Sequence, residues 1–301
     1  MGQAGAADNS NPSTIFLNPA NVIGAPRLYA QGAMVTSDVF YKDYWIRRAS
    51  AGTSWSLGKS GAVTMGLDAS YSKLHASLGF DFMTQSETLD EDVLALVAGV
   101  GFASGHNDFL IGIGAKRFSE SQTSFDYYMG ESVTEDRDAM AFDAGFEARH
   151  RATLQGWDVN SALGVAMVNA GNDLETGDGY EDHLPRQFNF GLNTRMVSPT
   201  VGVLSARVPL ITFCASLDAM QPRDDDWVWM AGTELAVAQI FFLRNGIQTY
   251  TGNHNPDPSL ATWGAGVGVP AGKLRARLDY GRQGEYFGKL EHFELTLEWT
   301  L

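Results

Sequence analysis

The sequence predicts an all-β protein, a transmembrane antiparallel β-barrel of about 14 strands with a short N-terminal segment in its lumen. Three observations predict this fold class. Apolar and polar residues alternate with a period of two along most of the chain, the alternating stretches are long, and short and long connections alternate between them. Crossing a bilayer takes strands of about 9–11 residues, whereas strands of globular proteins usually have about five or six.

The composition excludes several other classes of protein. The 301 residues include 21 Lys and Arg against 35 Asp and Glu, so the formal net charge is −14 and no nucleic-acid-binding surface is expected. A single cysteine rules out a disulfide framework and a multi-cysteine zinc site. The most apolar run, at 93–103, has about half of the roughly 20 residues that a membrane-spanning helix needs.

Residues 1–26 do not alternate, and their two Asn-Pro dipeptides predict turns and irregular structure. Because a barrel this wide is not filled by its own side chains, we expect 1–26 to fold into the lumen as a hatch, with 27–301 forming the barrel. The alternative is a disordered tail outside the barrel.

Four consecutive residues of this hatch are candidates for a ligand site. Phe16 and Leu17 are expected to line a pocket. Asn18 is expected to hydrogen-bond to exposed backbone groups, and Pro19 to fix a turn.

The predicted strands each have one apolar and one polar face, because successive side chains of a strand point to opposite sides. In 139–150, for example, Phe142 and Phe146 alternate with Asp143 and Glu147. In a membrane barrel the apolar face meets lipid and the charged face lines the lumen. The predicted strands are 27–37, 44–57, 61–82, 91–103, 107–118, 139–150, 156–169, 186–196, 200–218, 226–238, 241–250, 260–269, 272–281 and 290–301.

Two of these strands, 61–82 and 200–218, are longer than a bilayer requires. A change in the phase of the alternation near Ser72 predicts a bulge or bend in the first of them. Pro209 predicts the same in the second, because proline cannot donate a hydrogen bond to a neighbouring strand.

Long connections are predicted at 119–138 and 170–185, and short ones at 58–60 and 197–199. Most acidic residues lie in or beside the long connections, and therefore at one end of the barrel. We interpret this acidic rim as a solvated surface. The alternative is a docking surface for a basic partner, or for divalent cations that bridge to anionic lipid headgroups.

The chain ends on a predicted strand in which every second residue is apolar. These residues are Phe293, Leu295, Leu297, Trp299 and Leu301. The pattern resembles the C-terminal assembly signal of bacterial outer-membrane barrels, with leucine where phenylalanine is usual. The resemblance implies a location in the outer membrane of a Gram-negative bacterium, with the signal peptide already removed from this numbering. A soluble edge strand is the alternative, and it would leave an apolar edge open to aggregation.

Five arginines on predicted lumen faces interleave with carboxylates. They are Arg149, Arg195, Arg244, Arg275 and Arg277. The first interpretation is a ladder of ion pairs that fills the lumen. The second is a site for a ligand carboxylate that uses Arg244 or Arg275. The six histidines lack metal-binding spacing and no catalytic motif is present, so we expect no metal, no cofactor and no enzymatic activity.

Several short motifs are similar to one family of such barrels. The motifs are Met1-Gly2-Gln3-Ala4-Gly5, Asn18-Pro19-Ala20, and the strand 163–171 followed by Leu184-Pro185-Arg186. Together they resemble the FadL superfamily and its shorter PorV-type relatives, although Gln3 stands where a glycine is typical.

The FadL-type resemblance implies passive uptake of hydrophobic small molecules, which would leave sideways through a strand kink, here within 61–82. The PorV-type resemblance implies instead an accessory of protein secretion, or a structural barrel that anchors surface proteins. The expected partners are outer-membrane lipid and lipopolysaccharide, a hydrophobic small molecule, and surface or secretion proteins that dock on the acidic loops. No nucleic acid is expected among them.

Overall fold

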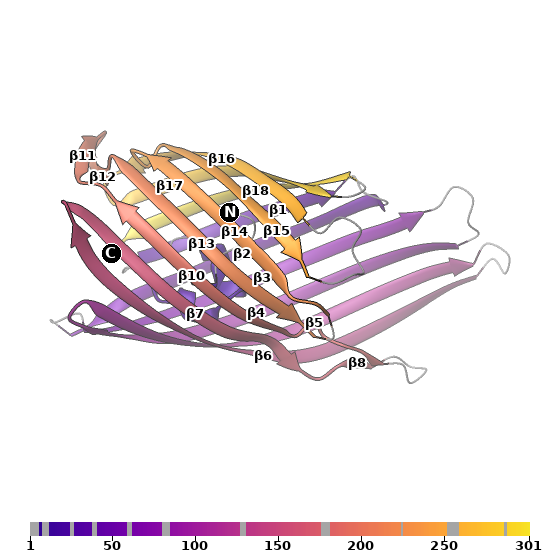
Figure 1. The fold of residues 1–301 in the computed structure, drawn as a ribbon. Coiled ribbons are helices and arrows are strands. Elements are labelled where there is room, and N and C mark those ends of the chain that lie inside the picture. Colours follow the sequence, from indigo (N-terminus) through magenta and orange to yellow (C-terminus); the bar gives the residue numbers. More distant parts are fainter. Residues whose placement is uncertain are drawn as a thin grey trace.

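A closed barrel of 14 antiparallel strands forms the body of the molecule, as the computed structural model in Figure 1 shows. The predicted all-β barrel is thus confirmed. The barrel closes where β1 pairs with β18, from Arg27 opposite Thr300 to Ser37 opposite Leu290. The structure describes residues 6–7, 12–24, 27–37, 41–58, 62–79, 85–126, 131–175, 181–223, 225–251, 259–285 and 288–301.

Consecutive strands of the barrel are neighbours in space, so every connection joins adjacent strands. The barrel strands are β1 Arg27–Ser37, β2 Tyr41–Leu57, β3 Val63–Gly79, β4 Gln85–Ser104, β5 Asn107–Asp126, β6 Glu131–Leu154, β7 Trp157–Gly171, β10 Gln187–Val197, β13 Ile211–Pro222, β14 Val228–Val237, β15 Phe241–Tyr250, β16 Ser259–Ala271, β17 Leu274–Glu285 and β18 Gly288–Thr300.

The two ends of the barrel differ. At one end, called the short-turn end, β1 begins, β18 finishes, and most connections are tight. These tight connections are 58–62, 105–106, 155–156, 238–240 and 272–273. At the opposite end, called the long-strand end, β4, β5 and β6 are prolonged to 20, 20 and 24 residues. These three strands therefore form a tall wall on one side of the barrel (Figure 1).

Apolar side chains cover the outer face. Ile113, Phe142 and Leu243 are 62%, 59% and 61% exposed, as expected for side chains that meet lipid rather than protein. The inner face of the same strands carries buried polar groups such as Glu147 and Asp218. The four apolar residues that alternate along β18 lie on the outer face, between 42% and 48% exposed. They are Phe293, Leu295, Leu297 and Trp299.

The bulge predicted near Ser72 is wrong. β3 pairs with β4 over its whole length without a shift of register, and its pairing with β2 is regular from Asp43 to Leu57. The change of phase has another cause, because the outer face of β3 passes from Leu67 to Lys73 while the pleat continues. What changes at this point is the surroundings of the outer face, from lipid to water. Over Val63–Gly79, the part of 61–82 that forms β3, there is no break in pairing for the expected lateral exit to pass through.

Among the described barrel strands, register shifts occur between Tyr41 and Asp43 and between Phe142 and Ala144. The second register shift, between β6 and β7, lies in the middle of the barrel. Buried polar groups hold the two strands together there. Lys116 Nζ lies 2.8 Å from Asp143 Oδ2, and Asp143 Oδ1 accepts a hydrogen bond of 2.8 Å from the Asn169 backbone N–H. This register shift therefore does not open a gap between β6 and β7.

The predicted single strand 200–218 is also wrong. The chain forms a separate hairpin there, β11 Thr200–Val203 with β12 Ala206–Pro209, before β13 begins. This hairpin projects from the short-turn end (Figure 1). The predicted long connection 119–138 is largely strand, because β5 runs to Asp126 and β6 starts at Glu131. The connection after β7 contains two short paired strands, β8 Leu174–Glu175 and β9 Glu181–Asp182.

The helical content is confined to two 3-10 turns, η1 Pro12–Phe16 and η2 Pro19–Val22, among the residues that the structure describes. Neither these turns nor any other described helix has the length and apolarity needed to cross a membrane.

Candidate functional site

The N-terminal segment 12–24 lies inside the barrel against the inner face of the wall (Figure 1). Ile15, Val22 and Ile23 pack with Val97 of β4 and Leu110 of β5 in a buried apolar cluster. Burial of these side chains stabilises the segment in place, because apolar surface is removed from water. The segment blocks part of the lumen at mid-height.

Asn18 connects the segment to the wall. Its Nδ2 donates hydrogen bonds to the backbone oxygens of Ala6, at 2.8 Å, and of Phe146 on β6, at 3.2 Å. Its Oδ1 accepts a bond of 3.0 Å from the Ala20 N–H and so caps η2, which begins at Pro19. Asn18 is fully buried, so each of these bonds satisfies a group that water does not reach.

Three further polar contacts anchor the segment. The Ala6 N–H donates to Asp218 Oδ2 of β13 at 2.6 Å, and Asn189 Nδ2 of β10 donates to the Leu17 carbonyl at 2.8 Å. Arg149 Nη2 of β6 donates to the Ile23 carbonyl at 3.0 Å. Because β6, β10 and β13 all take part, the segment is held from several sides of the lumen.

Phe16 and Leu17 are half-buried, and they do not line either of the two cavities described below. The guanidinium of Arg48 lies 3.8 Å from the centre of the Phe16 ring. Such a cation–π contact fixes the ring against β2.

Glycines make room for the segment. On six consecutive strands, an inward-facing glycine lies so close to the N-terminal residues that an added Cβ would come within 3 Å of one of their atoms. On β3, β4, β5 and β6 that atom belongs to the segment 12–24, and on β7 and β10 it belongs to Ala6. This glycine belt consists of Gly66, Gly99, Gly112, Gly145, Gly164 and Gly191. A Cβ at Gly66 would lie 2.6 Å from the Val22 carbonyl oxygen, and one at Gly112 would meet the backbone of Pro19. Sequence reasoning missed this belt, although glycines on the polar face of consecutive strands are its signal.

A network of ion pairs fills the opposite side of the lumen. Arg244 of β15 bonds to Glu234 of β14 and to Asp279 of β17, each at 2.6 Å, and Arg277 also bonds to Asp279 at 2.6 Å. The side chains of Arg244, Glu234 and Asp279 are 14%, 11% and 6% exposed. Two carboxylates therefore neutralise Arg244, as in the ladder interpretation. Its Nη2 is buried and has no hydrogen-bond partner among the described residues.

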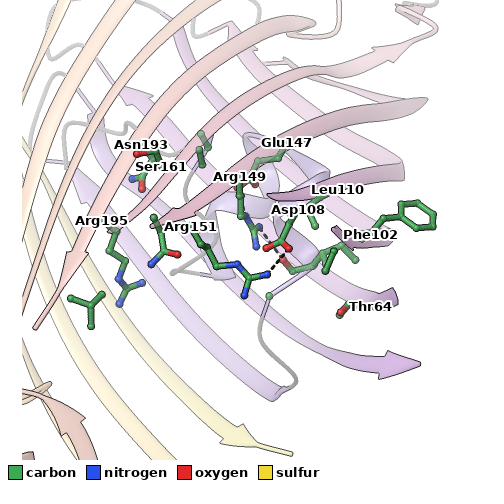
Figure 2. Close-up of a pocket in the computed structure, with 18 residues that line it drawn as sticks. Thr64, Phe102, Asp108, Leu110, Glu147, Arg149, Arg151, Ser161, Asn193 and Arg195 are labelled. Atoms are coloured by element: carbon green, nitrogen blue, oxygen red, sulfur yellow. Dashed lines mark hydrogen bonds and ion pairs between the residues drawn. The ribbon is translucent and has the colours of Figure 1, made fainter. Parts of the chain in front are cut away.

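Two cavities lie between the segment and the short-turn end. The larger, of about 500 Å³, is shown in Figure 2. Four of its charged lining residues form two pairs, Arg149 with Glu147 and Arg151 with Asp108, both at 2.5 Å. The smaller cavity, of about 300 Å³, is lined by Arg27, Phe242, Pro270 and Arg275 among others.

Arg195 lines both cavities. Among the described residues, neither Arg195 nor Arg275 makes an ion pair or a side-chain hydrogen bond. The structure therefore separates the two candidate arginines. Arg244 belongs to the ion-pair network, whereas Arg275 points into a cavity with its charge unmatched.

Toward the long-strand end the lumen holds a buried apolar cluster, next to the ion pair of Arg137 with Glu120 on the same wall. Phe118 and Ala139 of the tall wall form a buried cluster with Leu174 and Leu184, which come from the connection between β7 and β10. Leu184 is only 2% exposed. The described parts of this connection, 172–175 and 181–186, are called the cap, and Leu174 and Leu184 hold them against the wall. Across the lumen, Val228 and Met230 of β14 form a second buried apolar patch with Met220 and Tyr250.

Charged groups fasten the cap outside the membrane-spanning part. Asp173 accepts a bond of 2.7 Å from Arg223 Nη1 at the end of β13 and lies 2.8 Å from His183 Nδ1. Desolvation acts to raise the pKa of Asp173, but the bonds from His183 and Arg223 outweigh it. The pKa of this carboxyl is therefore below its ordinary value.

Acid is expected to loosen the cap. Because the pKa of Asp173 is lowered on folding, its contacts stabilise the closed cap above the ordinary aspartate pKa, and this stabilisation is lost as the pH falls through the lowered value. An acid protease should cleave the cap faster at about pH 2.5 than at about pH 5. The Asp173→Asn variant should show little of this difference. Equal pH dependence in both proteins would mean that Asp173 does not fasten the cap.

The described residues contain no group of three or more His, Cys, Asp or Glu side chains placed to hold a metal ion. The lumen has buried apolar side chains toward one end and matched and unmatched charges toward the other, with the N-terminal segment between them.

No protein-family model and no curated protein matches the sequence. Solved structures do match. They are the ΔS2S3 mutant of the TodX monoaromatic hydrocarbon channel (10% identity, TM-score 0.60, covering 97% of this chain and 95% of that one), a Pseudomonas aeruginosa FadL homologue (12%, 0.56, 99% and 96%) and the translocator domain of the autotransporter NalP from Neisseria meningitidis (11%, 0.54, 92% and 89%).

Identities this low show the fold alone. The chain has the closed barrel found in the FadL homologue, in the TodX channel and in the autotransporter translocator domain. The fold implied by the FadL-type resemblance is therefore confirmed.

Proposed function

We propose that this protein is a passive channel for hydrophobic small molecules in the bacterial outer membrane. The observation that carries the proposal is the apolar inner surface at the long-strand end, where the cap covers Phe118 and Ala139. Such a surface in a lumen otherwise lined by charges offers an apolar solute a favourable place to leave water. The solved TodX structure, described as a monoaromatic hydrocarbon channel, has the same fold.

In this proposal the N-terminal segment 12–24 is the hatch. A solute displaces the cap and binds to the apolar surface. The segment then separates the bound solute from the two cavities. Passage requires the segment to shift along the glycine belt. Because β3 offers no break in pairing, the route continues along the barrel axis to the short-turn end. Arg195 and Arg275 would meet any polar or anionic end of the solute there.

A secretion accessory or surface anchor of the PorV type is the second candidate. The observation that favours it is the tall wall of β4, β5 and β6, whose upper parts carry acidic residues on strands rather than in loops. A firm, charged surface of this kind suits a docked protein better than a small apolar solute. The ion-pair network on β14–β18 also narrows the lumen.

Flux through reconstituted protein distinguishes the two candidates. Vesicles that contain the barrel should take up toluene faster than empty vesicles, and Leu184→Asp should lower this flux about tenfold, because a carboxylate would replace a buried apolar contact of the cap. Leu204→Asp is the matched control, since Leu204 is 77% exposed at the tip of the β11–β12 hairpin.

Toluene flux at the level of empty vesicles, with correctly folded protein, would reject the channel and leave the accessory function. A flux that Leu184→Asp and Leu204→Asp reduce equally would show that the solute does not pass the cap.

A further inference from the structure

The outer face of β2 and β3, beside the tall wall, changes from apolar to charged within one row of residues. Cross-strand partners place Ala51, Ala69 and Leu96 side by side on β2, β3 and β4. Four residues further toward the long-strand end along β2 and β3, the outward row contains Arg47 and Lys73. This sharp boundary marks the upper edge of the membrane on this side of the barrel, because charged side chains avoid the hydrocarbon core.

Arg47 and Lys73 are direct cross-strand partners. Both point outward, since their neighbour Arg48 is turned inward against Phe16. Like charges directly opposite each other destabilise a sheet. An anion between the two side chains would remove this repulsion.

The part of the chain that the structure describes supplies no anion to Arg47. Its guanidinium lies 4.4 Å from the centre of the Trp45 ring, and among the described residues it makes no ion pair. Lys73 forms two long salt bridges, 3.7 Å to Asp90 and 4.0 Å to Asp92, and both carboxylates come from β4, on the side away from Arg47.

These two carboxylates are already engaged by other groups. Asp90 lies 3.0 Å from His75 Nδ1, and Asp92 accepts a bond from the Tyr71 hydroxyl. The side of Lys73 that faces β2 and Arg47 is therefore electropositive, whereas the acidic side chains lie toward β4.

The surface below this pair suits lipid chains. The outward residues of β2 and β3 just inside the membrane edge are small, among them Ala49, Ala51 and Ala69, and the larger Leu67 and Tyr71 stand beside them. Acyl chains can lie against this shallow surface while a phosphate stays at the level of Arg47 and Lys73. Trp45 lies at the same level, where aromatic rings favour the interface.

We propose that Arg47 and Lys73 form a binding site for the phosphate monoester of an outer-leaflet glycolipid of the lipid A type. The guanidinium of Arg47 provides paired donors that match phosphate oxygens, and Lys73 provides a second positive charge. The site lies on the outside of the barrel, so it does not depend on solute passing through the lumen.

Native mass spectrometry of the full chain in detergent, titrated with monophosphoryl lipid A, tests the site. Each of Arg47→Gln and Lys73→Gln should weaken binding about fivefold, and the double variant about 30-fold, from the usual contribution of one basic residue at a membrane surface. Arg117→Gln is the matched control. Arg117 is also outward-facing and 62% exposed, but it is already paired with Asp138 at 3.2 Å.

Retention of the binding by the double variant would overturn the proposal, and so would equal binding of the same lipid without its phosphate. Inorganic phosphate that binds alone and displaces the lipid at equal concentration would show a site for small anions rather than for a lipid, and would also overturn it. Loss of the heat-modifiable, folded band on electrophoresis excludes a variant from the comparison, and the remaining single variant then decides.

Discussion

Replacing Gly112 with valine is expected to push the N-terminal segment off the inner wall while the barrel stays closed. A side chain at this position would collide with the backbone of Pro19, which cannot rotate away as a flexible side chain could. The segment is held by hydrogen bonds and a small apolar cluster, whereas β5 is held along its full length by β4 and β6. The segment is therefore held less firmly than β5, and it should be the part that moves.

The expected size follows from the cost of overpacking. About 1–3 kcal/mol is typical for extra carbon atoms in a packed interior. This changes the ratio of displaced to seated segment by about 5-fold to 150-fold. In planar bilayers the variant should therefore spend more time in conducting states than the wild-type protein, and thermal unfolding of the barrel itself should change little.

Gly32→Val is the matched control. Gly32 also lies within a barrel strand, β1, but it is exposed and a Cβ there meets nothing within 4 Å. If Gly112→Val conducts no more than Gly32→Val, the segment either moves without opening the lumen or is not the barrier. Both results would contradict the role of 12–24 as the hatch.

Arg244→Met should cause the largest loss of stability of any single change in the lumen. The variant would leave Glu234 and Asp279, which are largely buried, without the cation that they share. Removing one partner of a buried ion pair typically costs about 3–5 kcal/mol, because a charge is left uncompensated away from water. Denaturant unfolding of the protein in lipid vesicles measures this change in free energy.

Arg275→Met provides the comparison. Arg275 is exposed to the cavity, and no described carboxylate pairs with it, so its replacement should cost less than about 1 kcal/mol. The triple variant Arg244→Met, Glu234→Gln, Asp279→Asn should regain much of the lost stability, because it removes the charges together. Equal destabilisation by Arg244→Met and Arg275→Met would show that the network contributes nothing beyond ordinary packing.

The alternation of apolar and polar residues with a period of two predicted most of the fold. In a membrane barrel every strand has one face toward lipid and the other toward the lumen, so every strand shows this alternation. The prediction from this alternation failed where the two faces of a strand have similar surroundings. Above the membrane both faces meet water, so 119–138 reads as a polar connection although β5 and β6 continue through it. Near Ser72 the outer face turns polar, and the pattern changes phase without any change in the backbone.

The β11–β12 hairpin was hidden for a related reason. Residues 200–218 keep their alternation through Pro209 because the hairpin has its own apolar side, with Val208 fully buried. Only pairing partners distinguish it from a continuous strand, and these come from the rest of the barrel.

The site was predicted only in part. Asn18 and Pro19 stand out in the sequence because Asn-Pro dipeptides mark turns. The sequence pattern does not distinguish Arg244 from Arg275, because both are arginines on predicted lumen faces. Only the carboxylates that neighbour them in the structure distinguish the two. The glycine belt depends on the register of six strands and on where the segment lies, and neither is encoded locally.

The barrel strands differ greatly in length, so one side of the molecule is much taller than the other. β6 has 24 residues and β15 has 10. The difference of 14 residues (24 − 10) corresponds to about 46 Å along a strand. At the usual tilt of about 40° this is a rise of about 35 Å. In the outer-membrane location that we propose, with the long-strand end outward, an antibody or a phage would reach β4–β6 before β14 and β15. Immune recognition and sequence drift should concentrate on this one flank.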